Sequence, residues 1–289
     1  MMSAITVLLF TKVFVNVGWG APGTTLLGAD GVRAIRELGV AGVRTDIHYD
    51  DEWVDRVVGE LGSTGLEAIL VVHGQTEEEL LERALSALQA GHRHGVTGHI
   101  EVVNEPDLSG RWKKDPGSVG RVASRVSRLR ATMGLNVQVI LGGVSSLEAN
   151  AQSYAAAMLR GVGPDAAIHV LLGFHDYRDP RRNPWEASRG FASRVQEWQA
   201  FDRLRTSYGV FAATCTEFGY PTDKVSEDRQ WELIRYTLDF HSLNRAMHSV
   251  IYQLRDGPAE KLGLYDLVWR PKRAARALGA YISSMETHR

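Results

Sequence analysis

Two glutamates stand at the ends of apolar, β-branched stretches, where a buried carboxylate is costly unless a partner or a reaction uses it. Glu105 follows the run at residues 99–104 and precedes Pro106. Proline lacks an N–H and pushes the residue before it into an extended conformation, so the strand should stop there. Glu217 ends the run at residues 211–217. Two facing carboxylates can divide the roles of proton donor and nucleophile.

A cation that could pair with one of these carboxylates is Arg44, in the stretch 43–48, where Val, Thr and Ile alternate with Arg44, Asp46 and His48. A wholly polar strand face is unusual if protein covers both sides of the strand. One interpretation is a buried ion pair of Arg44 with Asp46 that stabilises the fold. The other is that Arg44 points into a site and keeps a catalytic carboxylate ionised.

Other polar residues stand where apolar runs end. His73 ends one run and could simply cap it. His175 and Tyr177 share a face by the period of two, so the tyrosine hydroxyl could bond a carboxylate nucleophile. Tyr252 and Asp256, near the end of the last run, are candidates for substrate contact, although an aspartate before a glycine is equally a turn signal.

The neighbours of the two glutamates carry two structural expectations. Asn104 and Glu105 are adjacent, and adjacent residues on a regular strand face opposite sides. Both can reach one site only if the strand is irregular there, and we predict that irregularity. Ala213 and Cys215 are expected on the same face as Glu217, where their small side chains would leave room.

The elements that must position these residues follow from the alternation of apolar runs with amphipathic stretches. Eight strands, each followed by a helix, predict one (β/α)8 TIM barrel over residues 1–289, with Glu105 on the fourth strand and Glu217 on the seventh. A doubly wound sheet is the alternative, but residues 18–23 lack the dinucleotide-binding glycine pattern. The predicted strands are 13–17, 42–48, 68–73, 100–105, 137–142, 169–174, 211–217 and 249–254; examples of the amphipathic stretches between them are 30–38, 77–90, 119–133, 153–159, 191–207 and 227–244, and a last helix is predicted at 271–284.

Composition narrows the classes of partner. The net charge of −1 offers no broad field to attract nucleic acid or an anionic membrane. The single cysteine, Cys215, excludes an internal disulfide and a cysteine-based metal cluster. Residues 1–10 contain an apolar run that is too short to span a bilayer, and they lack the basic start of a secretory signal, so we expect an extra strand or cap beneath the first core strand. Cellular location and oligomeric state stay open.

The two glutamate motifs resemble retaining glycoside hydrolases of clan A. They read VNEP at residues 103–106 and TEFG at 216–219. In that clan the strand-four glutamate after an asparagine is the acid/base and the strand-seven glutamate is the nucleophile, which implies these roles for Glu105 and Glu217. Arg44, and His175 with Tyr177, extend the likeness. Residues 15–19, 252–257, 263–265 and 270–272 are similar to the family 39-like branch.

The resemblance implies a carbohydrate substrate and no cofactor or metal. Asn104 is expected to bind the sugar hydroxyl next to the reacting carbon. Loop aromatics could stack on sugar rings or simply pack their loops. The clan usually has a tryptophan at the end of strand eight, where this chain has Tyr252 and Gln253, and the chain has no room for the branch's accessory β domain. The loop aromatics are Trp19, Trp112, Trp185 and Tyr220.

Two functions from other classes compete with this one. A metal-dependent barrel hydrolase would use His48, His73, His175 and Asp256, but no strand carries the His-x-His pair or the bridging lysine of such sites. A barrel that binds sugar without catalysis is the second alternative. The presence of both glutamates argues against it.

Overall fold

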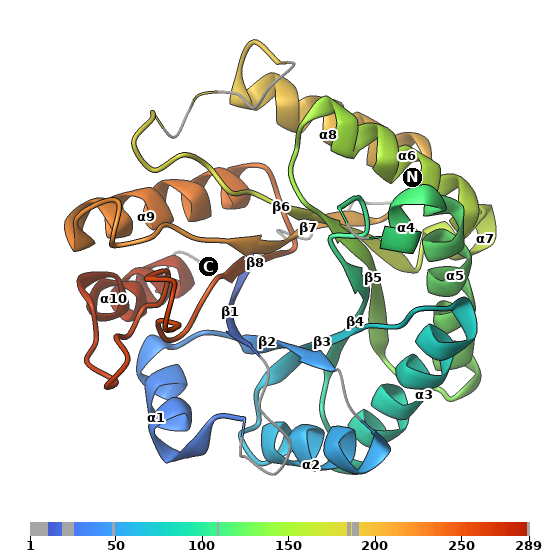
Figure 1. The fold of residues 1–289 in the computed structure, drawn as a ribbon, viewed down its shortest axis with the longest axis horizontal. Coiled ribbons are helices and arrows are strands. Elements are labelled where there is room, and N and C mark those ends of the chain that lie inside the picture. The colour runs from blue at the N-terminus through green and yellow to red at the C-terminus, as the bar shows by residue number, and fades with distance from the viewer. Residues whose placement is uncertain are drawn as a thin grey trace, which may run out of the picture.

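The computed structural model describes residues 11–18, 26–47, 50–108, 110–183, 186 and 191–287. Eight parallel strands form a closed barrel in chain order, and β8 pairs with β1. The helices surround this barrel (Figure 1). The structure therefore confirms the predicted (β/α)8 fold. The strands are β1 (Lys12–Gly18), β2 (Gly42–Ile47), β3 (Glu67–Val72), β4 (Gly98–Asn104), β5 (Val137–Val144), β6 (Val170–His175), β7 (Ala212–Phe218) and β8 (His248–Ile251).

Local signals in the sequence explain where several helices begin. Five helices follow directly on a residue whose side chain accepts a hydrogen bond from a backbone N–H of the first turn. These residues are Asp50 before α2, Thr76 before α3, Asp115 before α5, Ser193 before α8 and Ser226 before α9. This bond satisfies a donor that has no partner inside the helix. The helices are α1 (Gly28–Leu38), α2 (Asp51–Gly62), α3 (Glu77–His94), α4 (Gly110–Lys114), α5 (Pro116–Thr132), α6 (Ala149–Val162), α7 (Pro164–Ala167), α8 (Arg194–Ser207), α9 (Glu227–Leu243) and α10 (Arg273–Thr287).

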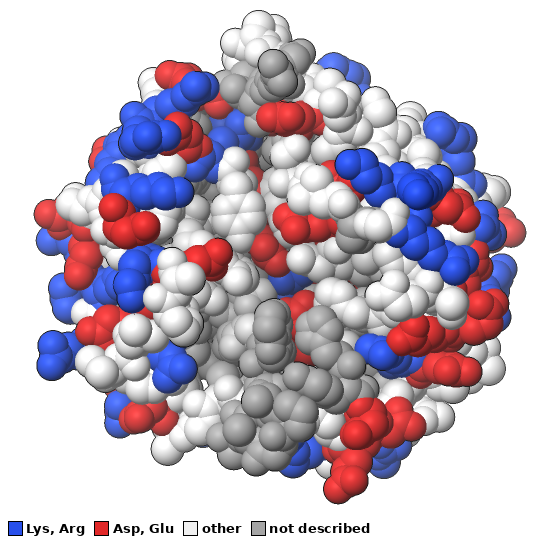
Figure 2. Space-filling view, in the orientation of Figure 1, with Lys and Arg blue, Asp and Glu red and all other residues white. Residues whose placement is uncertain are grey.

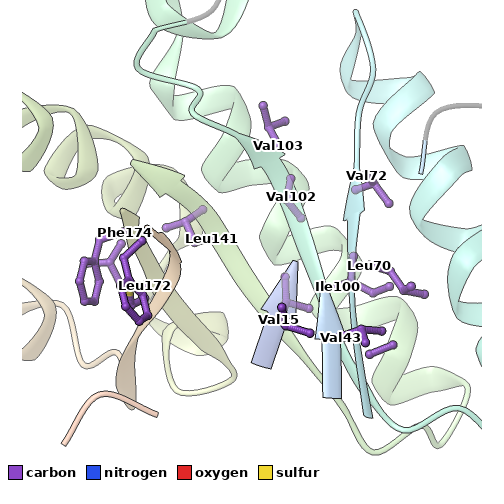
Figure 3. Close-up of a cluster of buried hydrophobic side chains, with 14 of the residues drawn as sticks. Val15, Val43, Leu70, Val72, Ile100, Val102, Val103, Leu141, Leu172 and Phe174 are labelled. Carbon is purple, nitrogen blue, oxygen red and sulfur yellow. The ribbon is translucent and has the colours of Figure 1, made fainter. Parts of the chain in front are cut away.

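The core has two layers. Most buried apolar side chains lie between the strands and the surrounding helices, and Figure 3 shows some of them, including Val43, Leu70 and Ile100 on neighbouring strands. A smaller cluster fills the barrel interior. Its members come from early or middle positions in their strands, so the interior near the carboxyl ends is left to polar side chains. The inner cluster comprises Phe14, Ile69, Ile140, Leu171, Ala212 and Val250.

Two further expectations concern the first ten residues and the possibility of a membrane-spanning segment. Residues 1–10, expected to form a strand or cap, lie outside the described residues. Within the described ranges, no helix combines the length and the apolar character needed to cross a membrane.

Candidate active site

The end of β4 is irregular, as predicted. Val103 has a φ of 65° and Glu105 a φ of 44°, both in the left-handed region that a β-branched residue rarely adopts. Asn104 pairs with Gly143 of β5, and its amide oxygen accepts a hydrogen bond of 2.9 Å from Arg44 Nη2. Strained backbone of this kind costs about 1–3 kcal/mol per residue and is concentrated at functional sites. The irregular strand end presents both Asn104 and Glu105 to polar partners inside the barrel.

Arg44 is fully buried, and its guanidinium joins three of the polar side chains. Nη1 donates to Glu217 Oε1 at 2.6 Å, and Nε and Nη2 donate to the two oxygens of Glu101 at 2.7 and 3.1 Å. Burial opposes its charge, but Glu101 and Glu217 outweigh that effect and raise the pKa of Arg44 well above its ordinary value. Its hydrogen-bonded ion pairs are thus with these two glutamates rather than with Asp46. Acidic and basic side chains also meet in the hollow at the middle of the face in Figure 2.

Glu101 is a site residue that the sequence reasoning missed. Its side chain is fully buried, and it accepts a further hydrogen bond of 3.2 Å from the Gly143 N–H. A signal for it was present, because Glu101 stands in the middle of the same buried run as Glu105. The argument that a buried carboxylate needs a partner applies equally to both.

Glu217 is held from two sides. In addition to Arg44, the Tyr177 hydroxyl donates to Glu217 Oε2 at 2.9 Å, so the tyrosine reaches this carboxylate as the strand period predicted. Although 37 % of the Tyr177 surface is exposed, burial of its hydroxyl end and the Glu217 charge raise its pKa well above the ordinary value. Tyr177 therefore remains a hydrogen-bond donor over the working pH range of most enzymes.

The expected face of β7 was wrong. Ala213 and Cys215 belong to the outer layer between strands and helices, not to the mouth. Thr214 faces the interior, where its hydroxyl lies 3.1 Å from His248 Nδ1. Glu217 reaches the mouth because the pairing with β6 shifts by one residue between Phe174 and His175. An irregularity of this kind reverses the alternation that sequence parity assumes.

His175 stands between the two catalytic candidates. Its Nδ1 lies 3.0 Å from Glu105 Oε1 and 3.7 Å from Glu217 Oε2. Burial disfavours a charged ring, but the two carboxylates, Glu217 foremost, outweigh burial and raise the pKa of His175. A Cβ on Gly143 would lie 2.8 Å from His175 Nε2, so this close approach requires glycine.

The remaining predicted residues have separate places. His73 Nε2 lies 2.8 Å from Asp46 Oδ1. Tyr252 follows β8, and its ring lies 6.4 Å from that of Tyr177. Burial and the Glu217 charge raise the pKa of Tyr252 to about 12. Asp256 accepts hydrogen bonds from Lys272 Nζ at 2.7 Å and from the Gly263 N–H at 2.8 Å, which ties it into the loop between β8 and α10.

For two of the loop aromatics, the structure favours loop packing over stacking on a sugar ring. Trp112 and Tyr220 are buried, with their polar atoms bonded to the Gly74 carbonyl and the Thr237 hydroxyl, so they pack loops and offer no ring to a substrate. Trp19 and Trp185 lie outside the described residues.

The structure does not gather the ligands of the alternative metal site. His73, His175 and Asp256 contact Asp46, Glu105 and Lys272 respectively, and His48 lies outside the described residues. Over the described ranges, no group of three or more His, Cys, Asp or Glu side chains is arranged to hold a metal ion.

A second buried network lies behind the end of β6. Asp176, between His175 and Tyr177, accepts hydrogen bonds from Arg178 Nε at 2.6 Å and Arg194 Nη2 at 2.5 Å, and lies 3.0 Å from His241 Nε2. Burial alone would raise the pKa of Asp176, but the surrounding cations lower it well below its ordinary value. This network fixes the strand end that carries both flanking site residues.

Comparison with known proteins gives structural neighbours. The sequence matches no protein-family model and no curated protein. A family 39 glycoside hydrolase from Bacteroides cellulosilyticus WH2 superposes with a TM-score of 0.69 at 17% identity, over 96% of this chain and 64% of that one. The present chain thus spans less than two thirds of that neighbour. The neighbour belongs to the family whose motifs the sequence resembles.

Two further neighbours match over most of both chains. A β-1,3-glucanosyltransferase active-site mutant from Rhizomucor miehei, in complex with laminaritriose, has a TM-score of 0.62 at 12% identity, over 90% of this chain and 96% of that one. An endocellulase from Pyrococcus horikoshii, in complex with cellotetraose, has a TM-score of 0.60 at 11% identity, over 92% of each chain. At these identities the comparisons establish the shared barrel fold.

Proposed function

We propose that this protein is a retaining glycoside hydrolase in which Glu217 is the nucleophile and Glu105 the acid/base. The observation that carries the proposal is the unequal environment of the two carboxylates. Glu217 accepts one hydrogen bond from Arg44 and one from Tyr177, so each of its two oxygens has a fixed donor. The Glu105 side chain is 33% exposed and contacts His175. Environments that differ in this way separate the roles of two carboxyl groups.

In the first step, Glu105 gives its proton to the glycosidic oxygen as the bond from that oxygen to the anomeric carbon breaks. Glu217 attacks the same carbon and forms a covalent glycosyl-enzyme. In the second step, water attacks the anomeric carbon and gives a proton to Glu105, while the bond to Glu217 breaks. Two inversions give overall retention.

The position of His175 supports retention over inversion. His175 Nδ1 lies 3.0 Å from Glu105 Oε1 and 3.7 Å from Glu217 Oε2, so the two carboxylates lie close to each other around one ring nitrogen. Retaining enzymes hold their carboxyl groups about 5–5.5 Å apart, whereas inverting enzymes need about 6.5–9.5 Å to admit a water. His175 also lies where it can stabilise Glu105 after proton donation. Asn104, held by Arg44, is proposed to bind the hydroxyl next to the anomeric carbon.

Hydrolysis of a defined panel tests the proposal. The panel contains laminaritriose, cellotetraose, mannotriose, xylotriose and the matching p-nitrophenyl glycosides, with the nucleophile variant Glu217→Gln as the inactive control. We expect release of sugar from at least one compound, with proton NMR showing first a product of the same anomeric configuration as the substrate. Failure to cleave any compound would favour the sugar-binding alternative. A first product of opposite configuration would contradict the double displacement.

A further inference from the structure

The amide of Asn16 is an unexplained buried donor. Asn16 is 1% exposed, and its Oδ1 accepts a hydrogen bond of 2.7 Å from the Gly18 N–H. That bond fixes the orientation of the amide, because only the oxygen can accept. Its Nδ2 has no hydrogen-bond partner among the described residues. A buried donor left without a partner is destabilising, so its presence calls for an explanation.

Asn16 lies beside the proposed catalytic residues. It is paired in register with Arg44 of β2. Phe14, two residues earlier on β1, belongs to the cluster inside the barrel, and the period of two places Asn16 on that inner face as well. Asn16 therefore stands one strand from the guanidinium that holds Glu217.

Asn16 also lines a cavity of about 650 Å³ at the β1 and β8 side of the barrel. Its volume is within the roughly 300–1,000 Å³ typical of small-molecule sites. Tyr252, Gln253 and Trp269 line the same cavity. Through Tyr252, whose ring lies against that of Tyr177, the cavity adjoins the hydroxyl that bonds Glu217.

The lining of this cavity suits an uncharged polyhydroxylated ligand. It offers amide and hydroxyl groups together with an indole ring. Two of its charged residues are already paired, Asp256 with Lys272 and Asp30 with Arg33, while Arg255 lies over the Trp269 ring at 5.0 Å. Neutral polar groups around a partly apolar wall fix the orientation of a ligand without selecting for charge.

We propose that Asn16 is a specificity-determining residue, whose Nδ2 donates a hydrogen bond to one hydroxyl oxygen of the sugar ring that reacts with Glu217. This inference rests on the proposed function. A substrate that lacks this oxygen leaves the donor buried and unpaired, so the site discriminates against it. The identity of that hydroxyl is the unknown that the experiment determines.

The test pairs Asn16→Ala with monodeoxy versions of the p-nitrophenyl glycoside that the wild type cleaves fastest. For one deoxy compound we expect wild-type kcat/KM to fall about tenfold, the value of one such hydrogen bond. Asn16→Ala should lose about tenfold on the parent compound and nothing further on that deoxy compound. Equal losses on every compound would mean a merely structural role and would overturn the proposal, as would an unchanged rate on the parent.

Control and binding measurements separate this inference from the proposed function. Asn244→Ala, at the end of α9, removes an asparagine far along the chain and should leave all rates unchanged. If the wild type cleaves nothing, tryptophan fluorescence is titrated with laminaritriose and cellotetraose. About tenfold weaker binding by Asn16→Ala would then support the sugar contact while overturning hydrolysis. Equal affinity, or no binding of either sugar by the wild type, would overturn the Asn16 contact.

Discussion

Arg44 places one buried cation between two carboxylates, Glu101 and Glu217. Its planar fork of donors can bond both at once and still reach Asn104, which a lysine ammonium cannot do with the same geometry. His175, with its raised pKa, is a second place where positive charge can balance the acidic cluster. The site is therefore held by charge as well as by shape.

Tyr177→Phe removes the hydroxyl that bonds Glu217 and little else. Hydrogen bonds to charged groups contribute about 1.5–3 kcal/mol, so we expect kcat to fall about tenfold to a hundredfold. The melting temperature should change little because the side chain is partly exposed. Steady-state kinetics on a cleaved glycoside provides the measurement, with Tyr208→Phe as control. An unchanged kcat would remove Tyr177 from the proposed mechanism.

For individual residues, the sequence predicted which polar side chains would serve a carboxylate better than it predicted their exact contacts. Arg44 and Tyr177 were predicted to serve a carboxylate, and both bond Glu217. Asp256 was an ambiguous candidate, and only coordinates could reveal its bond to Lys272, sixteen residues later. The sequence showed that a buried Glu101 needs a partner, but it could not identify that partner as Arg44, which lies 57 residues earlier on another strand.

The end of β6 is the element that sets the site geometry, since alternate residues there face opposite directions. His175 and Tyr177 face the carboxylates, while Asp176 faces the cations of the second network. The Asp176 carboxylate is thus an anchor on the outer side of the strand. A buried charge that loses its partner is strongly destabilising.

Asp176→Asn removes the carboxylate that Arg194 and Arg178 share, although Arg178 keeps its ion pair with Glu197 at 2.9 Å. We expect a loss of about 3–5 kcal/mol in the free energy of unfolding, measured by urea denaturation. Because the pKa of Asp176 is depressed in the folded state, its stabilisation is present above its ordinary pKa and is lost as the pH falls. Asp179→Asn, which breaks an exposed pair in the same loop, is the matched control and should change little. Equal stability of the two variants would contradict this account.

The strand irregularities show what element-level reasoning can reach. The kink at Val103 and Glu105 was predictable because two adjacent residues were both needed at one site. The register shift before Glu217 was not predictable. Because of it, the prediction that Ala213 and Cys215 share a face with Glu217 was wrong. A shift of one residue depends on how neighbouring strands pair, and that information is spread over the whole barrel.

The order of the eight strands was predicted because periodicity and chain spacing determine a parallel barrel without detailed contacts, whereas α2, α4 and α7 were not among the helix ranges named from the sequence. The opposite end of the barrel interior carries a feature that the sequence did not indicate. His99 and His248 lie together there, with ring centroids 4.3 Å apart beside Phe14. Burial lowers the pKa of His99 to about 4 and lowers that of His248 well below its ordinary value.

This pair predicts acid sensitivity of the whole fold. Between pH 4 and the ordinary histidine pKa of 6.5, His99 is protonated in the unfolded chain and neutral in the folded chain. The free energy of unfolding therefore falls as the pH falls through that window. His99 alone should contribute a loss of about 3 kcal/mol. His99→Leu should flatten the dependence of the melting temperature on pH, whereas His92→Leu, at an exposed position, should not. Identical pH profiles for the two variants would contradict the prediction.

The central claim is that Glu217 forms a covalent bond to the sugar and Glu105 handles the proton. Azide rescue of Glu217→Gly and Glu105→Gly on a p-nitrophenyl glycoside that the wild type cleaves tests it most directly. We expect Glu217→Gly to lose hydrolysis on the order of a thousandfold or more. Added azide should then yield a glycosyl azide of inverted configuration. Glu105→Gly with azide should yield the retained product instead. Unchanged hydrolysis by Glu217→Gly, or a retained azide from it, would contradict the account.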